Sequence, residues 1–356
     1  MKVLTIAGTR PQLVKIGAVS RVLRESFNEV LVNTGQHYDY KMAGVFFDEL
    51  KIPKPDYDLG IGSDTHGRQT ARMMIAVEEV VEKEKPDMIL VYGDTNSTLA
   101  GATVAAKLHI PIIHIEAGLR SYNKRMPEEV NRILTDHIST MLFAPTDNAV
   151  KNLKSEGISE GVYQVGDVMY DAVLYNIGLA EERYSIQDFG LIEKKYILGT
   201  IHRADNTDDS EKLKAILNAF AVVEEIVYLP LHPRTKKMIK ESGYNDIIKN
   251  AGNIKVVEPI SYLEMLFLEK NAKAIVTDSG GVQKEAYFAK VPCLTLRDQT
   301  EWIETIETGW NQLVDPLKEN LTIKLSALRP GKPVNNLYGD GHAAEKIVSL
   351  MKNHFE

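Results

Sequence analysis

Met88-Ile-Leu-Val-Tyr92 is a run of apolar residues that ends in the polar turn Gly93-Asp94-Thr95-Asn96. A second run, Ile110-Pro-Ile-Ile-His-Ile115, ends in Glu116-Ala-Gly-Leu-Arg120. Short apolar runs that are bounded by turn residues are typical of strands buried on both faces of a parallel sheet. Ligands bind beyond the carboxyl ends of such strands, so we expect the acids that follow these two runs to converge on one pocket.

These acids are Asp94 and Glu116, and Glu128 follows them in Pro127-Glu-Glu-Val-Asn-Arg132. Acids gathered at one pocket indicate proton transfer between the protein and a ligand. Each acid alone is explained equally well by capping of the next helix or by an ion pair with an arginine of this region. Three acids in succession favour the catalytic interpretation.

Length and charge set the class of protein. The chain has 356 residues and a formal net charge of -7. This length exceeds what one core usually supports, so we expect two domains. The acidic balance argues against nucleic acid or a membrane surface as the main partner, because both bind basic surfaces. No apolar stretch approaches about 18 residues and no signal segment is evident, so we expect a cytoplasmic protein.

Apolar β-branched runs alternate with amphipathic segments along the chain, which predicts strand, helix, strand units and an α/β fold. The predicted strands cover residues 3–7, 30–33, 88–92, 110–115, 141–144 and 162–165, and then 196–201, 226–231, 254–257, 274–277 and 292–296. The rhythm of strands lapses between the two series. We therefore predict two doubly wound, Rossmann-like domains that face a cleft, at 1–172 and 173–340, with a C-terminal helix in 341–356 that can pack back on the first domain.

The first candidate phosphate site is Gly8-Thr-Arg-Pro11, which follows a predicted strand and opens a helix. A helix N-terminus offers free N–H groups to an anion, and Arg10 and Lys15 are cations within reach. Gln36 and His37 follow the second predicted strand, where they either line the cleft or form a turn. Neither a dinucleotide fingerprint nor a P-loop is present.

A second candidate phosphate site is formed by Ser279, Gly280 and Gly281, between a predicted strand and a predicted helix. Backbone amides and a hydroxyl in this context can surround a diphosphate, and Glu285 can accept hydrogen bonds from ribose hydroxyls. A plain loop is the alternative for the tripeptide. Among the histidines, His202 is the candidate for chemistry because it follows the first strand of the second series, with a surface role as the alternative.

Seven motifs occur in order: Gly8-Thr-Arg-Pro11, Thr34-Gly-Gln-His37, Gly93-Asp-Thr95, His114-Ile-Glu-Ala-Gly-Leu-Arg120, Pro127-Glu-Glu-Val-Asn-Arg132, Thr200-Ile-His-Arg203 and Thr277-Asp-Ser-Gly-Gly281. Together they resemble the non-hydrolysing UDP-N-acetylglucosamine 2-epimerase family over nearly the whole chain. The resemblance implies a two-domain GT-B-like fold, a UDP-sugar substrate, inversion at sugar C2 without NAD or a metal ion, and a homodimer.

The resemblance also implies a mechanism and roles for residues. A base removes the C2 proton as UDP leaves C1, which gives a 2-acetamidoglucal, and UDP then adds back with protonation from the opposite face. By the same resemblance, the catalytic positions are Asp94, Glu116, Glu128 and His202, and the substrate or UDP-binding positions are Arg10, Lys15, Gln36, His37, Arg132, Ser279, Gly280, Gly281 and Glu285.

Three departures from the family pattern leave the substrate open. Trp302 stands where better known members have arginine, Gln12 where they often have glutamate, and Gly166-Asp-Val where they often have Gly-Asn-Thr. The Thr-Glu-Trp form resembles the subgroup that acts on UDP-2,3-diacetamido-2,3-dideoxyglucuronic acid. The same two-domain architecture would also serve a GT-B glycosyltransferase, a hydrolysing 2-epimerase or a UDP-sugar binding protein without catalysis.

Cys293, the single cysteine, lies in an apolar run, where a buried structural thiol is the expected role.

Overall fold

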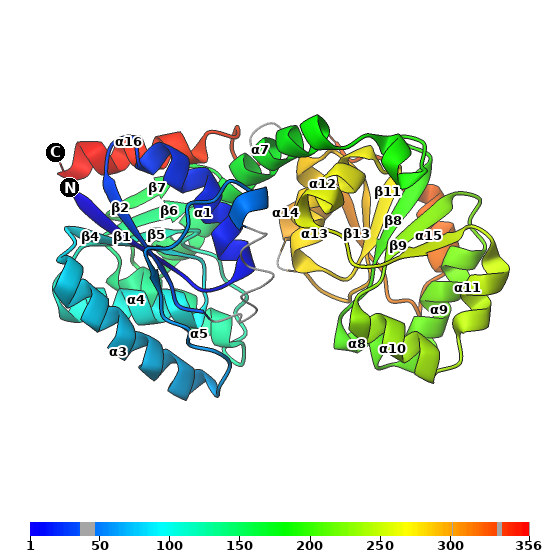
Figure 1. Cartoon of the computed structure of the whole chain (residues 1–356), viewed down its shortest axis with the longest axis horizontal. Helices are drawn as coiled ribbons and strands as arrows, with labels where there is room; N and C mark the ends of the chain where they lie inside the picture. Colours follow the sequence, from blue (N-terminus) through cyan, green and yellow to red (C-terminus); the bar gives the residue numbers. More distant parts are fainter. Residues whose placement is uncertain (36–46, 301, 333–336, 356) are drawn as a thin grey trace. The chain divides into compact units, whose positions relative to one another are not determined.

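Figure 1 shows the computed structural model, which describes residues 1–35, 47–300, 302–332 and 337–355. The chain divides into two compact units: unit 1 is Met1–Tyr175 with Asn335–Glu356, and unit 2 is Asn176–Val334. Unit 1 is therefore built from two separate parts of the sequence. None of the helices in the described part of the chain combines the length and apolar character needed to cross a membrane.

Unit 1 holds a seven-stranded parallel sheet in the order β3-β2-β1-β4-β5-β6-β7. Its strands are β1 (Lys2–Ala7), β2 (Asn28–Asn33), β3 (Tyr57–Asp58), β4 (Met88–Tyr92), β5 (Ile112–Ile115), β6 (Met141–Ala144) and β7 (Val162–Gln164). The order reverses between β1 and β4. At such a switch point the loops leave the sheet in opposite directions, so a crevice for ligands opens beyond the strand ends.

Helices cover both faces of this sheet (Figure 1). They are α1 (Arg10–Leu23), α3 (His66–Glu84), α4 (Asn96–Lys107), α5 (Pro127–Ile138), α6 (Asp147–Ser155) and α16 (Ala343–Phe355), while α7 (Val168–Arg183) crosses from unit 1 into unit 2. Helix α4 lies very close to the sheet, because a Cβ added at Gly101 would sit 2.7 Å from Ile6 Cδ1. The first turn of α4 is held at the end of β4, because the Thr98 hydroxyl donates to the Tyr92 carbonyl at 2.6 Å.

Unit 2 holds a six-stranded parallel sheet in the order β10-β9-β8-β11-β12-β13, with its own switch point between β8 and β11. Its strands are β8 (Tyr196–Thr200), β9 (Ile226–Pro230), β10 (Ile254–Val257), β11 (Ala274–Thr277), β12 (Cys293–Thr295) and β13 (Asn311–Leu313). Its helices are η1 (Ile186–Phe189), α8 (Ala204–Thr207), α9 (Ser210–Ala221), α10 (Pro233–Glu241), α11 (Asn245–Ala251), α12 (Tyr262–Asn271), α13 (Gly280–Phe288), α14 (Ile303–Glu307) and α15 (Leu321–Ala327).

Cys293 is buried in β12, and burial raises the pKa of its thiol to about 12.

The predicted α/β fold with two doubly wound parallel sheets is confirmed. Each predicted strand is present, with ends that differ by up to two residues; the strand predicted to start at 110 starts at Ile112, after Pro111. Strands β3 and β13 were not predicted, because edge strands of two or three residues carry almost no hydrophobic pattern.

Helix α16 completes unit 1 by packing against α1 and by joining the segment that follows β7. The Asp167 N–H donates to the Tyr338 carbonyl at 2.9 Å, and the Ala344 N–H donates to the Asp171 carboxylate at 2.7 Å. Between these bonds Gly166 meets Gly339, so closely that a Cβ added at Gly166 would lie 2.9 Å from Gly339 Cα. The junction therefore requires glycine.

We expect Gly166→Ala to destabilise the protein by about 2–4 kcal/mol, because the added methyl overlaps backbone and the residue has φ +97. The control is Gly178→Ala in α7, where an added Cβ meets nothing within 4 Å. That change should gain up to about 1 kcal/mol from helix propensity. Urea unfolding followed by circular dichroism measures both, and equal effects of the two substitutions would contradict the tight junction.

Candidate functional site

Gln12 joins the two sides of the unit 1 switch point. Its Oε1 accepts the backbone N–H groups of Gly8 and Thr9, at 2.9 and 3.2 Å. Its Nε2 lies 2.8 Å from the Tyr92 carbonyl and 2.9 Å from Thr95 Oγ1. An ionised glutamate at this position could not donate a hydrogen bond to the Tyr92 carbonyl. The amide of Gln12 can both accept and donate, so it connects the turn after β1 to the turn after β4.

Two ion pairs hold the acids that follow β4 and β5. Asp94 pairs with Arg132 of α5, and Glu116 pairs with Lys15 of α1. The Glu116 and Lys15 side chains are each only 10% exposed. A Cβ added at Gly93 would lie 3.8 Å from both Glu116 Oε2 and Lys15 Nζ, so this pair borders the turn that carries Asp94. Lys15, predicted to meet a phosphate, is therefore engaged by an acid.

Asp94 and Glu128 line one pocket of about 250 Å³, together with Thr9, Pro11, His66, Thr95, Asn96, Pro127 and Asn131. Glu128 is exposed in the first turn of α5 and has no ion-pair partner among the described residues. The neighbouring Glu129 has a different role. It is buried, and it accepts the N–H groups of Ser121 and Tyr122 at 2.8 Å each. Glu128 thus lines the pocket, whereas Glu129 holds the loop at Ser121 and Tyr122.

Burial acts to raise the pKa of the Glu129 carboxyl, but the hydrogen bonds from Ser121 and Tyr122 and the charge of Arg132 hold it below its usual range. Arg132 donates to Glu129 at 2.9 Å in addition to its contact with Asp94. Arg132 therefore links the loop support to the pocket.

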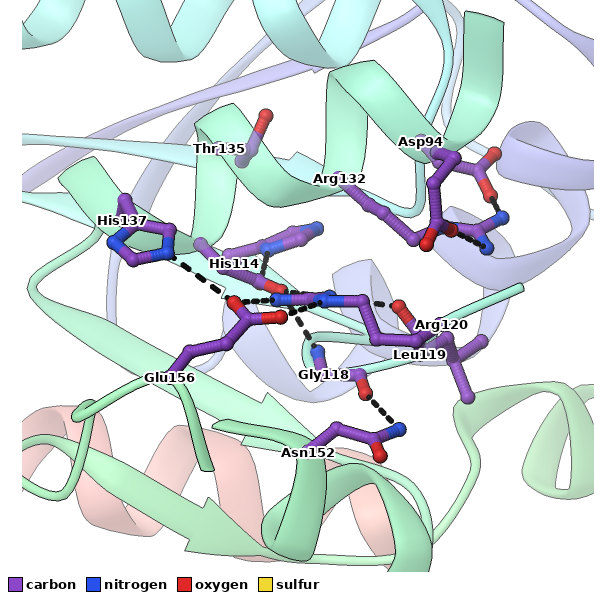
Figure 2. Close-up of polar contacts among 12 residues, drawn as sticks. Asp94, His114, Gly118, Leu119, Arg120, Arg132, Thr135, His137, Asn152 and Glu156 are labelled. Carbon is purple, nitrogen blue, oxygen red and sulfur yellow. Dashed lines mark hydrogen bonds and ion pairs between the residues drawn. The ribbon is translucent and has the colours of Figure 1, made fainter. Parts of the chain in front are cut away.

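Asp136 is the centre of a buried hydrogen-bond network. Figure 2 labels its partners His114, Gly118 and Arg120. His114 of β5 lies with Nε2 2.7 Å from the Gly93 carbonyl and Nδ1 2.7 Å from Asp136 Oδ1. The other carboxylate oxygen, Oδ2, accepts from the Gly118 N–H at 3.1 Å and from Arg120 Nη1 at 2.7 Å. One carboxylate thus joins the turn after β4 to the loop after β5.

Glu116 has φ +72, a left-handed conformation that is unfavourable for a residue with a Cβ. Its backbone N–H donates to the Phe143 carbonyl of β6 at 3.1 Å. The strained backbone directs the Glu116 side chain to Lys15 instead of continuing the strand.

His202 and Asp278 meet across the switch point of unit 2. Asp278 is fully buried and accepts the N–H groups of His202 and Arg203 at 3.1 and 3.0 Å. His202 Nδ1 also lies 3.2 Å from Asp278 Oδ1, while 43% of the His202 side chain is exposed. Arg203 lines a pocket of about 370 Å³ whose wall includes Asp205, Lys212, Arg297 and Asp298.

Ser279 occupies the N-cap position of α13 without a side-chain capping hydrogen bond, and Gly280 and Gly281 form the start of that helix. Gly281 is exposed, and a Cβ added there would meet only Ser279 Oγ, at 3.9 Å. Glu285, one turn later, is buried and accepts a hydrogen bond from the Tyr262 hydroxyl at 2.9 Å. Burial raises the pKa of the Glu285 carboxyl, against the opposing effects of Tyr262 and of the Lys284 charge.

The Trp302 ring lies against the side chain of Lys284. Lys284 Nζ lies 4.0 Å from the centroid of the ring, within the range of a cation–π contact. The Trp302 Nε1–H is buried without a hydrogen-bond acceptor among the described residues. The Trp302 ring thus contacts α13 through Lys284.

The structure brings together Lys15, Asp94, Glu116, Glu128 and Arg132 within unit 1, and His202, Ser279, Gly280, Gly281 and Glu285 within unit 2. Arg10 is exposed at the start of α1, while Gln36 and His37 lie outside the described residues. Among the described residues, no group of three or more His, Cys, Asp or Glu side chains is arranged to hold a metal ion.

Three residues of the two sites were not predicted from the sequence: His66, which lines the acid pocket, and Asp136 and Asp278, which hold backbone in place. Asp278 lies in the motif Thr277-Asp-Ser-Gly-Gly281, but its burial and acceptor role carry no pattern. His66 follows a polar segment without a motif, so nothing in the sequence singled it out.

The sequence profile of the family described as UDP-N-acetylglucosamine 2-epimerase matches residues 21–352. The chain is 52% identical to a UDP-N-acetylglucosamine 2-epimerase homolog of Methanococcus maripaludis, over 99% of this chain and 100% of that one. It is 45% identical to the UDP-2,3-diacetamido-2,3-dideoxy-D-glucuronate 2-epimerase of Pseudomonas aeruginosa, over 99% of each. Its structure is similar to that of the UDP-GlcNAc 2-epimerase of Methanocaldococcus jannaschii in complex with UDP-GlcNAc and UDP, with a TM-score of 0.85 and 45% identity over 99% of this chain and 100% of that chain.

We expect Asp136→Asn to destabilise the protein by about 3–5 kcal/mol, because it removes the carboxylate partner of buried His114 and one of the two carboxylate partners of buried Arg120. The control is Glu156→Gln, which removes the other, more exposed carboxylate partner of Arg120 and should cost about 1 kcal/mol or less. Burial acts to raise the pKa of the Asp136 carboxyl, but His114 and Arg120 hold it below its ordinary value of 3.8. The stabilisation is therefore full above pH 3.8 and is lost as the pH falls through the lowered pKa. Urea unfolding at pH 7 measures the difference, and equal losses for the two variants would contradict the role of Asp136.

Proposed function

The chain belongs to the UDP-N-acetylglucosamine 2-epimerase family, and we propose that it interconverts UDP-N-acetylglucosamine and UDP-N-acetylmannosamine without hydrolysis. The observation that carries this proposal is the set of Asp94 and Glu116, directly after β4 and β5, together with Glu128, in the first turn of α5 and in the same pocket as Asp94. Inversion at C2 requires acid and base groups on opposite faces of the sugar, and a pocket with several carboxyl groups can provide both.

The reaction proceeds by elimination and re-addition. A carboxylate of unit 1 takes the proton from C2, a double bond forms between C1 and C2, and the C1–O bond breaks with its electron pair passing to the β-phosphate of UDP. In the reverse step a phosphate oxygen of UDP attacks C1, and a carboxyl group on the other face returns a proton to C2. We assign these proton transfers to Asp94, Glu116 and Glu128 as a set.

The diphosphate would be held by unit 2. The N-terminus of α13 presents the backbone N–H groups of Gly280 and Gly281 beside the Ser279 hydroxyl, and the open space beside Gly281 suits an anion that approaches the backbone. Exposed His202, steadied by Asp278, would stabilise the negative charge that develops on the departing UDP. Glu285 would accept hydrogen bonds from the ribose. A homodimer belongs to this proposal by resemblance only, and a cytoplasmic location belongs to it as the expectation drawn from the sequence.

A second candidate substrate is UDP-2,3-diacetamido-2,3-dideoxyglucuronic acid. Two observations favour it: the 45% identity to an enzyme named for this substrate, and Trp302 in the position where better known family members have arginine. The Lys284 ammonium lies over the Trp302 ring, and a cation at this place would attract the carboxylate of that sugar.

Proton NMR in deuterium oxide tests the reaction. Wild-type protein with UDP-N-acetylglucosamine should exchange the C2 proton for deuterium and form the manno-configured UDP-sugar. Glu116→Gln and Asp94→Asn should lower the rate at least about 100-fold because each removes a proton-transfer group. A parallel run with the diacetamido glucuronic acid substrate shows which sugar reacts faster. Exchange with neither sugar, but sugar transfer once acceptors are added, would support a glycosyltransferase instead.

Gly281→Ala tests the diphosphate site independently of the chemistry. The free energy of unfolding should stay within about 0.5 kcal/mol, because the added methyl meets only Ser279 Oγ at 3.9 Å. The affinity for UDP should fall about tenfold or more, because the methyl occupies the space of the ligand. Calorimetric titration with UDP measures the affinity, and the Gly178→Ala variant is the matched control. An unchanged affinity would remove the α13 N-terminus from the site.

A further inference from the structure

A chain of amide side chains ends at His66 in the acid pocket of unit 1. Asn131 Nδ2 donates to the Asp94 carbonyl at 2.9 Å and to Asn96 Oδ1 at 3.1 Å. Asn96 Nδ2 lies 2.8 Å from Gln69 Oε1 and 3.1 Å from His66 Nδ1. Asn96, Asn131 and Gln69 are each at most 5% exposed, so the network is shielded from water.

Backbone groups at both ends fix the direction of these hydrogen bonds. The Asp94 carbonyl can only accept, so Asn131 must present its NH2 group there and to Asn96. The Gly62 carbonyl, 3.1 Å from Gln69 Nε2, can also only accept, so Gln69 turns its oxygen to Asn96. Asn96 Oδ1 consequently accepts a hydrogen bond from Asn131, and Asn96 Nδ2 donates one to Gln69.

The imidazole tautomer follows from this direction. With both protons of its NH2 group committed, Asn96 donates one to Gln69 and the other to the Nδ1 atom of His66. A ring nitrogen that accepts carries no proton, so the proton of the neutral ring sits on Nε2. Among the described residues Nε2 has no hydrogen-bond partner, and the exposed ring lines the pocket of Asp94 and Glu128.

We propose that His66 is a substrate-binding residue that donates a hydrogen bond from Nε2–H to an uncharged oxygen of the sugar. This inference rests on the proposed function. The acceptor is uncharged because Asp94 and Glu128 in the same pocket disfavour an anionic group there. Hydroxyl and acetamido carbonyl oxygens of the substrate fit this requirement. Asn96 is a positioning residue that acts through His66.

The test separates the sugar from the nucleotide. For His66→Ala we expect kcat/KM for UDP-N-acetylglucosamine to fall about 5- to 20-fold, as for the loss of one hydrogen bond. Inhibition by UDP, which lacks the sugar, should stay within about twofold of wild type. His66→Gln should recover much of the loss, because its amide NH2 can donate from near the position of Nε2. Glu78→Ala, on the exposed face of the same helix, is the control and should change neither constant.

Asn96→Asp tests the positioning role, because a carboxylate cannot donate to Nδ1 and the ring must then place a proton there. The double variant with His66→Ala should lose no more kcat/KM than the worse single variant. Unchanged kcat/KM in His66→Ala, an equal loss of UDP inhibition, or additive losses in the double variant would each overturn the inference. Wild-type protein that fails to turn over the sugar would instead remove the proposed function, and the inference with it.

Discussion

The contacts of the Asp136 carboxylate with His114 and Arg120 are the interaction on which the site in unit 1 depends. A carboxylate without exposure to water is costly, and only the full set of donors from His114, Gly118 and Arg120 compensates for it. The same donors belong to the strand and loop that carry Glu116, and His114 also binds the carbonyl of the turn that carries Asp94. The buried carboxylate therefore holds the turn with Asp94 and the loop with Glu116 in place, and proton transfer requires accurate distances there.

Two of the three acids at the site are paired with a cation. Lys15 contacts Glu116 and Arg132 contacts Asp94, while Glu128 has no ion-pair partner among the described residues.

Much of this architecture follows from sequence because parallel strands buried on both faces read as apolar runs, and residues such as Asp94 and Glu116 stand directly after them. The remaining candidate site residues were predicted from the family motifs. Two kinds of residue were not predicted from the sequence. Support residues such as Asp136 act through burial and hydrogen-bond direction, which no local pattern encodes. His66 reaches the pocket through contacts with Asn96, thirty positions away in the chain, so only the three-dimensional arrangement reveals it.

Unit 1 contains residues from both ends of the described chain, whereas unit 2 is continuous. During synthesis the ribosome releases all of unit 2 before it releases α16, which packs against α1 in the first unit. Domains generally fold as units, in the order in which they are completed. The seven strands of the unit 1 sheet all precede unit 2 in the chain, but the surface of α1 that α16 covers stays exposed until translation of unit 2 is complete. The last helix of unit 1 can therefore pack only after all of unit 2 has been translated.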